Sequence, residues 1–227
     1  EAMRGIKQPS EFHPEGDVFA HTHAVIKRLK NPSVVLAFSA LFHDLGKPAT
    51  YAVRNGRITF YGHASLGADL ASRIMKRLRF SNDEIQAVGT CIENHMKFGD
   101  VQKMRLGKLK QLIARPTFEE ELELHRVDCL ASHRMLNNYR FLRRKQKEFA
   151  DEQLRPKAYV NGHDLIRLGM VPGPVMKPLL EDLYERQLEG AFRNRQAAIL
   201  YAKRKIAKTF GQGRGHPKGK RSSLGRC

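Results

Sequence analysis

The stretch Leu41-Phe42-His43-Asp44-Leu45-Gly46-Lys47 carries the most informative pattern of this chain. It ends the most apolar helix that the sequence predicts, from Val34 to about Leu45, so His43 and Asp44 are expected inside the protein core. A buried carboxylate beside an imidazole is costly unless a divalent metal ion or a basic side chain compensates its charge. An isolated pair of this kind is more often structural than metal-binding, so a metal site is predicted only if neighbouring elements supply further ligands.

Four further side chains that can bind a metal ion lie at helix ends or on inward helix faces. They are His21, His63, His95 and Asp128. Imidazole nitrogens and carboxylate oxygens together suit Mg, Mn, Fe, Co, Ni or Zn. With His43 and Asp44 they predict a site for one or two divalent ions. Structural roles stay open for two of them, because His63 could simply begin its helix and His95 could complement a helix dipole.

Hydrophobic spacing predicts an all-α fold with one small hairpin around Asn55-Gly56. Asp17 is expected to begin the first helix, Ser33 to cap the second, and Gly46 with Pro48 to end it. Ser81 and Glu84 form the pattern of a capping box. The expected organisation is a lead-in loop at 1–16, a main domain at 17–153, a smaller helical section at 157–206 and a disordered basic tail at 207–227.

The chain has 227 residues and a formal net charge of +18. Its last 25 residues, 203–227, hold nine Lys or Arg and no acid, and the remainder is still basic. Such an excess favours a polyanionic partner, and RNA is the first expectation. We expect Arg134, Arg140, Arg143, Arg144 and Lys145 to contact RNA, although a solvated helix face would look similar.

No apolar stretch approaches the length of a membrane span, and the chain opens without a secretory signal. The three cysteines form no Cys-x-x-Cys pair and no plausible disulfide framework. We therefore expect a cytoplasmic protein without a membrane partner.

Several motifs resemble a known family. The order His, His-Asp, His, His, Asp, with Leu-Gly-Lys after His-Asp, resembles the HD superfamily of metal-dependent phosphohydrolases. The match is more specific to the HD domain of bacterial CCA-adding tRNA nucleotidyltransferases and related poly(A) polymerases. It rests on His13–Phe19, Phe42–Pro48, Phe60–His63, Leu78–Ser81, Asn94–Met96 and, further on, Val160–Ile166.

This resemblance implies that His21, His43, Asp44 and Asp128 hold one metal ion, while His63 and His95 complete a second site or bind phosphate. His43, Asp44 and Lys47 would be catalytic, with Lys47 reaching a phosphate oxygen as a point charge. The later helices would contact tRNA. No Gly-Gly near a paired Asp-x-Asp is found, so we expect these 227 residues to lack the nucleotidyltransferase head. A head on the same or a neighbouring chain stays open as a partner.

The leading hypothesis is metal-dependent hydrolysis of phosphomonoesters or phosphodiesters, such as 2′,3′-cyclic or 2′-phosphate ends of nucleotides or RNA. The alternative is a binding module, the tRNA-gripping body of a CCA-adding enzyme with a vestigial or structural metal site. A nucleotide-sensing module is the weaker third reading.

Overall fold

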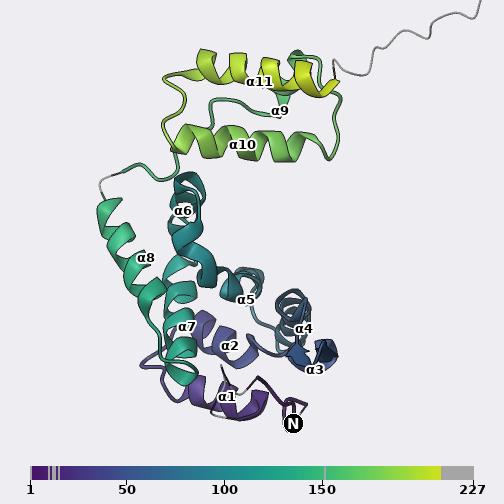
Figure 1. Ribbon diagram of the computed structural model, residues 1–227, viewed down its shortest axis with the longest axis vertical. Helices are drawn as coiled ribbons and strands as arrows, with labels where there is room; N and C mark the ends of the chain where they lie inside the picture. The colour runs from purple at the N-terminus through teal and green to yellow at the C-terminus, as the bar shows by residue number, and fades with distance from the viewer. Residues whose placement is uncertain (1, 10, 12–13, 15, 151, 211–227) are drawn as a thin grey trace, which may run out of the picture. The chain divides into compact units, whose positions relative to one another are not determined.

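The computed structural model describes residues 2–9, 11, 14, 16–150 and 152–210 (Figure 1). The chain divides into two compact units. The first comprises residues 1–105 and 109–154, and the second comprises 106–108 and 155–227. Each unit has its own hydrophobic core, so the two are described separately.

The first unit begins with two short helices whose N-terminal caps, Asp17 and Ser33, were predicted from the sequence. They are α1 (Val18–Ile26) and α2 (Val34–Phe42). The Asp17 carboxylate accepts a hydrogen bond from the Ala20 amide, and the Ser33 hydroxyl accepts one from the Leu36 amide. Asp17 also accepts a hydrogen bond from the Gly5 amide, which ties the lead-in segment to the start of α1.

The short helix α3 (Lys47–Thr50) corrects the expected role of Pro48. The predicted helix ends at Phe42, and after a turn the chain enters α3 with Pro48 in its first turn, where a missing amide hydrogen costs nothing. The hairpin follows as β1 (Ala52–Arg54) and β2 (Arg57–Thr59), with Val53 opposite Ile58. Asn55 and Gly56 both have positive φ, as the tight turn between twisted strands requires.

Six further elements complete the first unit or border it. They are α4 (His63–Arg77), α5 (Asn82–Asn94), the 3₁₀ helix η1 (His95–Lys103), α6 (Leu106–Ile113), α7 (Phe118–Ala131) and α8 (Asn137–Glu148). The capping box of Ser81 and Glu84 begins α5, as predicted. Helix α5 packs against both α2 and α4, and α7 packs against α1 and α2. Buried side chains such as Ala40, Met75, Ile92 and Leu124 fill these contacts.

The second unit contains α9 (Gly162–Arg167), α10 (Met176–Leu188) and α11 (Arg195–Phe210). Leu165, Leu183 and Ala202 from the three helices share one buried cluster. Because α11 continues through Phe210, the predicted tail boundary at residue 207 is wrong by four residues. The rest of that predicted tail lies outside the described residues.

The all-α prediction is confirmed, since every regular element of the described residues is a helix except the two strands of the hairpin. None of its helices combines the length and the apolar character that crossing a membrane requires.

Candidate metal centre

The six predicted ligands come together from separate elements of the first unit. His21 lies in α1, His43 and Asp44 directly follow α2, and Asp128 lies in α7. His63 is the first residue of α4, and His95 stands where α5 passes into η1. All four imidazoles are buried, as is Asp44. The sequence pattern therefore places these side chains in one neighbourhood through the packing of five helices.

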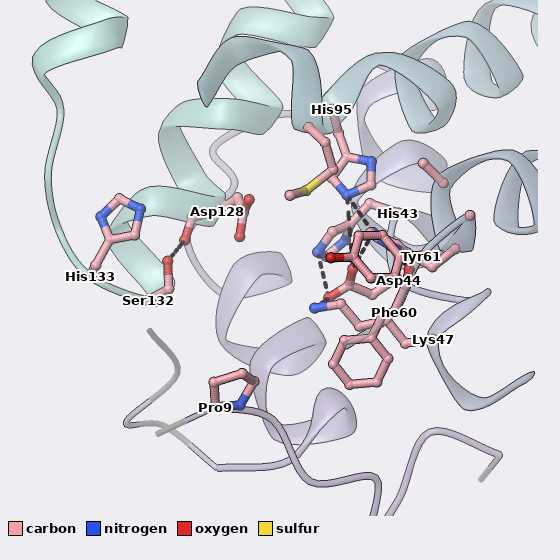
Figure 2. A pocket seen from close by; sticks show the side chains of 14 residues that line it. Pro9, His43, Asp44, Lys47, Phe60, Tyr61, His95, Asp128, Ser132 and His133 are labelled. Carbon is pink, nitrogen blue, oxygen red and sulfur yellow. Dashed lines mark hydrogen bonds and ion pairs between the residues drawn. The ribbon is translucent and has the colours of Figure 1, made fainter. Parts of the chain in front are cut away.

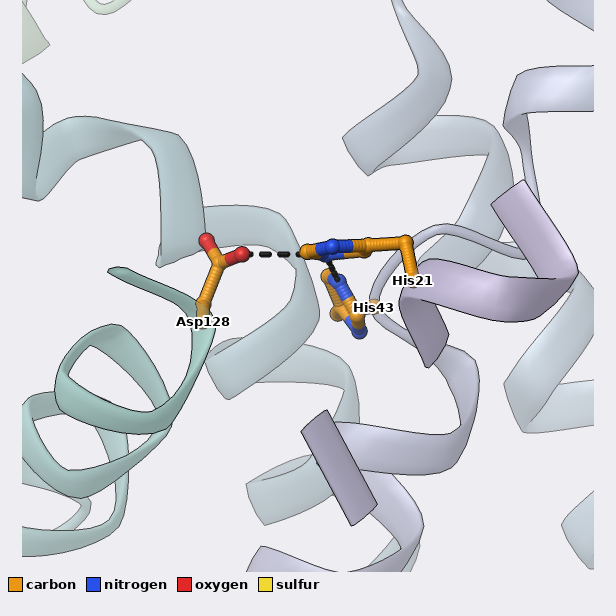
Figure 3. Close-up of side chains that lie close together, drawn as sticks. All are labelled: His21, His43 and Asp128. Carbon is orange, nitrogen blue, oxygen red and sulfur yellow. Dashed lines mark hydrogen bonds and ion pairs between the residues drawn. The ribbon is translucent and has the colours of Figure 1, made fainter. Parts of the chain in front are cut away.

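His21, His43 and Asp128 form a first cluster (Figure 3). The Nε2 atoms of His21 and His43 lie 3.3 Å apart, and Asp128 Oδ1 lies 3.0 Å from His21 Nε2. One ligand atom from each of the three residues lies within 4.8 Å of the others. This spacing suits coordination of a single ion.

Asp44, His63 and His95 form a second cluster of the same kind. The Nε2 atoms of His63 and His95 lie 3.2 Å apart. Asp44 Oδ1 lies 3.7 Å from His63 Nε2 and 3.9 Å from His95 Nε2. Asp44 Oδ2 instead lies toward the first cluster, 3.3 Å from His43 Nε2 and 3.8 Å from His21 Nε2. The two carboxylate oxygens of Asp44 therefore face different clusters.

The hydrogen bonds of three imidazoles determine which nitrogen is left to bind a cation. Nδ1 of His43 lies 2.9 Å from the Ala40 carbonyl, Nδ1 of His63 lies 2.8 Å from that of Phe60, and Nδ1 of His95 lies 2.6 Å from that of Ile92. A carbonyl only accepts, so each Nδ1 carries the proton and each neutral ring presents a lone pair at Nε2. Two such lone pairs, on His63 and His95, face each other at 3.2 Å. His63 and His95 would hold a divalent cation through these lone pairs, which would remove the repulsion, and backbone-anchored Nδ1 atoms are usual in metal-binding histidines.

The protonation states of the isolated protein suit a cation. Burial raises the pKa of Asp44, but His43, Lys47 and His21 outweigh it and hold that pKa well below its usual range. Burial and the nearby His43 lower the pKa of His95 to about 4, and burial also lowers the pKa of His63. Burial lowers the pKa of His43 as well, yet Asp44 and Asp128 outweigh it and the net direction is upward. At neutral pH the second cluster is thus an ionised carboxylate with two neutral imidazoles.

Lys47 is buried against Asp44, so a basic side chain, which the sequence left open as a partner for this carboxylate, does lie beside it. Its Nζ lies 2.7 Å from Asp44 Oδ2 and donates to Gln8 Oε1 at 2.6 Å. The ring of Phe60 lies beneath the ammonium, with its centroid 5.3 Å away. Among the described residues Asp44 Oδ2 nevertheless accepts no hydrogen bond of regular geometry. The predicted phosphate contact of Lys47 stays a prediction, while its contact with Asp44 makes it a positioning group.

Gln8 is a site residue that sequence reasoning missed. It lies in the lead-in segment, which the Asp17 contacts with Gly5 hold beside α1, and it is 7% exposed.

Gly46 explains how the turn after Asp44 approaches the start of α4 so closely. A Cβ atom on Gly46 would lie 2.1 Å from the His63 carbonyl oxygen and 2.9 Å from the Gly67 amide nitrogen. Only glycine at position 46 lets the turn after Asp44 contact the start of α4.

The clusters open into a pocket of about 660 Å³ (Figure 2). Five of the six predicted ligands line it, namely His43, Asp44, His63, His95 and Asp128. Phe60 and Tyr61 lie together in Figure 2, and Ser132 and His133 lie beyond Asp128. A substrate can therefore reach both clusters from one side.

The predicted RNA contacts gather around the start and the body of α8. Arg143 is paired with Glu119, while Arg144 and Lys145 are both paired with Glu148. Arg134 and Arg140 are exposed and form no ion pair within the described part of the chain. The net positive charge of this face is therefore smaller than its sequence suggests, and its role with RNA stays a prediction.

The family model of the HD domain matches residues 18–132, the region that contains all six predicted ligands. The A-adding tRNA nucleotidyltransferase of Deinococcus radiodurans is 26% identical over 225 residues, covering 92% of this chain and 50% of that protein. The CC-adding tRNA nucleotidyltransferase of Thermus thermophilus is 27% identical over 166 residues, covering 72% and 38%. The multifunctional CCA protein of Pasteurella multocida is 23% identical over 209 residues, covering 88% and 48%.

The predicted resemblance to tRNA nucleotidyltransferases is confirmed by these matches. The chain spans about half the length, or less, of these curated relatives.

Proposed function

The chain belongs to the HD-domain family, and from this premise we propose that it is a metal-dependent phosphohydrolase. The observation that carries the proposal is the placement of Asp44 between two pairs of imidazole Nε2 atoms. The His63–His95 pair has no proton to share when both rings are neutral, because each ring carries its proton on Nδ1, and the Asp44 carboxylate that faces this pair is buried. A cation bound there would satisfy both imidazoles and the carboxylate at once.

Two ions fit the donor set. His21, His43 and Asp128 would hold one, His63 and His95 would hold the other, and Asp44 would contribute one oxygen to each. Divalent ions supply positive charge for the phosphate oxygens and acidify water for attack at neutral pH. Lys47 holds the Asp44 carboxylate in place through its 2.7 Å contact, and Gln8 holds Lys47 in turn.

The substrate that we propose is a phosphomonoester or phosphodiester of a nucleotide or of RNA, such as a 2′,3′-cyclic or 2′-phosphate end. The net charge of +18 supports a polyanionic partner. The names of the relatives concern tRNA ends, which supports an RNA substrate for this chain as well.

The test uses the metal-stripped protein with single divalent metals added back. We expect hydrolysis of adenosine 2′,3′-cyclic phosphate to return with at least one of Mn, Co, Ni, Mg, Fe or Zn. Asp44→Asn should reduce kcat/KM by at least about 10³-fold, because both clusters lose a charged ligand. Asp69→Asn changes an exposed carboxylate of α4 in the same way and should keep full activity. Full activity in Asp44→Asn would refute the assignment of the active site.

A second candidate is the body of a tRNA-gripping protein whose metal site is structural. The relatives' names and the basic charge favour it. Nucleotidyl transfer needs paired carboxylates for Mg²⁺, and the hairpin strands β1 and β2 of the described residues carry none. The purified 227-residue chain should therefore bind tRNA without adding CCA to it. Incorporation of labelled nucleotide would overturn this expectation, and tight tRNA binding without any hydrolysis would favour the gripping role.

A further inference from the structure

The β-hairpin carries a second pocket beside the metal pocket. Its walls are Arg54, Asn55, Arg57, Thr59 and Tyr61, and it has a volume of about 490 Å³. No carboxylate contributes to these walls. Tyr61 also lines the metal pocket, so a ligand that occupies one pocket can continue past this side chain into the other.

Two arginines of this hairpin face each other across the strands, an arrangement that destabilises the hairpin. Arg54 and Arg57 lie directly opposite each other across the two strands, and both are exposed. Like charges in this position repel. Neither arginine forms an ion pair with an acid in the part of the chain that the structure describes. An anion bound between them would turn this repulsion into attraction.

Two consecutive aromatic residues of the metal pocket differ in their exposure and in their contacts. Phe60 covers the Lys47 ammonium, whereas the following residue, Tyr61, is 72% exposed. The Arg54 guanidinium lies 5.3 Å from the centroid of the Tyr61 ring. An exposed aromatic ring beside cationic side chains offers a stacking surface for a nucleobase.

The opposite flank of the metal pocket is less suited to a polyanion. A pocket there shares Ser132 and His133 with the metal pocket and also contains Arg28 and Arg134. It includes the carboxylate of Glu11, and one guanidinium nitrogen of Arg28 is bound to the Ala24 carbonyl at 2.7 Å. The hairpin flank, with two unpaired arginines and no acid in its walls, is the stronger site for a phosphate.

We propose that the hairpin pocket binds the internucleotide phosphate next to the reacting phosphate, so that the preferred substrate is the end of a single-stranded RNA rather than a free nucleotide. Arg54 and Arg57 contact that internucleotide phosphate, and Tyr61 stacks on the base between the two phosphates. The claim about the substrate rests on the proposed hydrolase function. The claim about the hairpin site does not, because binding of single-stranded RNA tests it without any hydrolysis.

The hydrolysis experiment compares two substrates that end in the same 2′,3′-cyclic phosphate: adenosine 2′,3′-cyclic phosphate and the dinucleotide ApA carrying that end. The wild type should favour the dinucleotide in kcat/KM by at least about tenfold, the worth of one charge-assisted contact. The double variant Arg54→Gln/Arg57→Gln should bring this ratio close to one, with kcat/KM for the mononucleotide unchanged.

The matched control is Arg73→Gln/Arg77→Gln, which removes the same charge from exposed positions of α4. These residues lie about 15 Å or more along the helix from His63. The control should keep the wild-type ratio. An equal dinucleotide preference in the hairpin variant and in the wild type would overturn the proposal.

A binding arm separates failure of this proposal from failure of the proposed function. A fluorescently labelled oligoadenylate hexamer is titrated with metal-stripped protein, and its anisotropy gives the Kd. The hairpin variant should bind at least about tenfold more weakly than the Arg73→Gln/Arg77→Gln control. If neither substrate is hydrolysed but this difference in Kd is found, the hydrolase function fails and the hairpin site stands. Equal Kd values for the two variants would remove the hairpin site whatever the hydrolysis results.

Discussion

Asp44 is the residue on which both clusters depend, because its two oxygens face different pairs of histidines. His43 is the ligand whose protonation should limit metal binding. The net pKa shift of His43 is upward, whereas the pKa of His95 is lowered to about 4 and that of His63 is also lowered. As the pH falls, His43 therefore gains a proton before His63 and His95 do.

The first prediction at the residue scale concerns pH. Metal binding requires neutral His43, so the apparent affinity should fall as the pH drops through its raised pKa and level off above it. Titration of metal-stripped protein with Co²⁺ between pH 5.5 and 8.5, followed by absorbance, measures this. His21→Asn should weaken the binding, whereas His23→Asn, at an exposed position of the same helix, should not. An affinity that does not vary over this range would contradict the role of His43.

The second prediction concerns the close contact of Gly46 with the start of α4. In Gly46→Ala the new methyl group would meet the backbone at His63 and Gly67, which cannot yield as a flexible side chain can. We expect a loss of about 3 kcal/mol in the free energy of unfolding and weaker metal binding through displaced His63. Chemical denaturation with and without metal measures both effects.

The matched control is Gly89→Ala in α5, where an added Cβ meets no atom within 4 Å. The free energy of unfolding of this variant should rise by about 1 kcal/mol, because alanine has a higher helix propensity than glycine. A Gly46→Ala protein as stable as the wild type would show that the backbone of this turn can move.

At the scale of elements, the helices position the ligands through their termini. His63 begins α4, His95 follows α5, and His43 follows α2, so small changes at a helix end move a ligand directly. The far end of α5 is held by the capping box, in which the Glu84 amide donates to Ser81 Oγ at 3.3 Å and the Ser81 amide donates to Glu84 Oε2 at 2.9 Å.

Ser81→Ala removes one half of this box and should cost about 1 kcal/mol of stability. Metal affinity should stay unchanged, since fraying is confined to the turn of α5 that lies away from His95. Glu84→Gln keeps the reciprocal pattern and serves as the control. Thermal unfolding measures the loss of stability, and a Co²⁺ titration shows whether the loss extends to the metal site. A loss of metal affinity as large as the loss of stability would mean that a change at the start of α5 moves His95 at its other end.

At the scale of the whole molecule, charge is distributed unevenly along the chain. Removing residues 211–227 deletes Arg214, Lys218, Lys220, Arg221 and Arg226 and no acid. We expect the slope of log K against log salt for RNA binding to flatten by about two to three, because each lost phosphate contact contributes about 0.7 on single strands. Hydrolysis of adenosine 2′,3′-cyclic phosphate should be unchanged. Equal salt slopes with and without the segment would exclude it from RNA binding.

Local signals in the sequence determined the elements of this protein. The caps at Asp17, Ser33 and Ser81 and the Asn55-Gly56 turn act over three or four residues, so they can be predicted without knowing the fold. The six candidate ligands could also be named, because imidazoles and carboxylates at helix ends and inward faces are unusual. Pro48 and the end of α11 were misjudged, because helix boundaries depend on contacts beyond the local sequence.

Only the tertiary structure decided how these residues are divided between the clusters. Asp44 is adjacent to His43 in the chain, yet one of its oxygens faces His63 and His95, which come from elements 19 and 51 residues further along. The support of Lys47 by Gln8, 39 residues away, likewise depends on how the lead-in segment is held beside α1. The physical reason is that charges and lone pairs interact through space, at distances of a few ångströms that packing brings about and that no local pattern in the chain encodes.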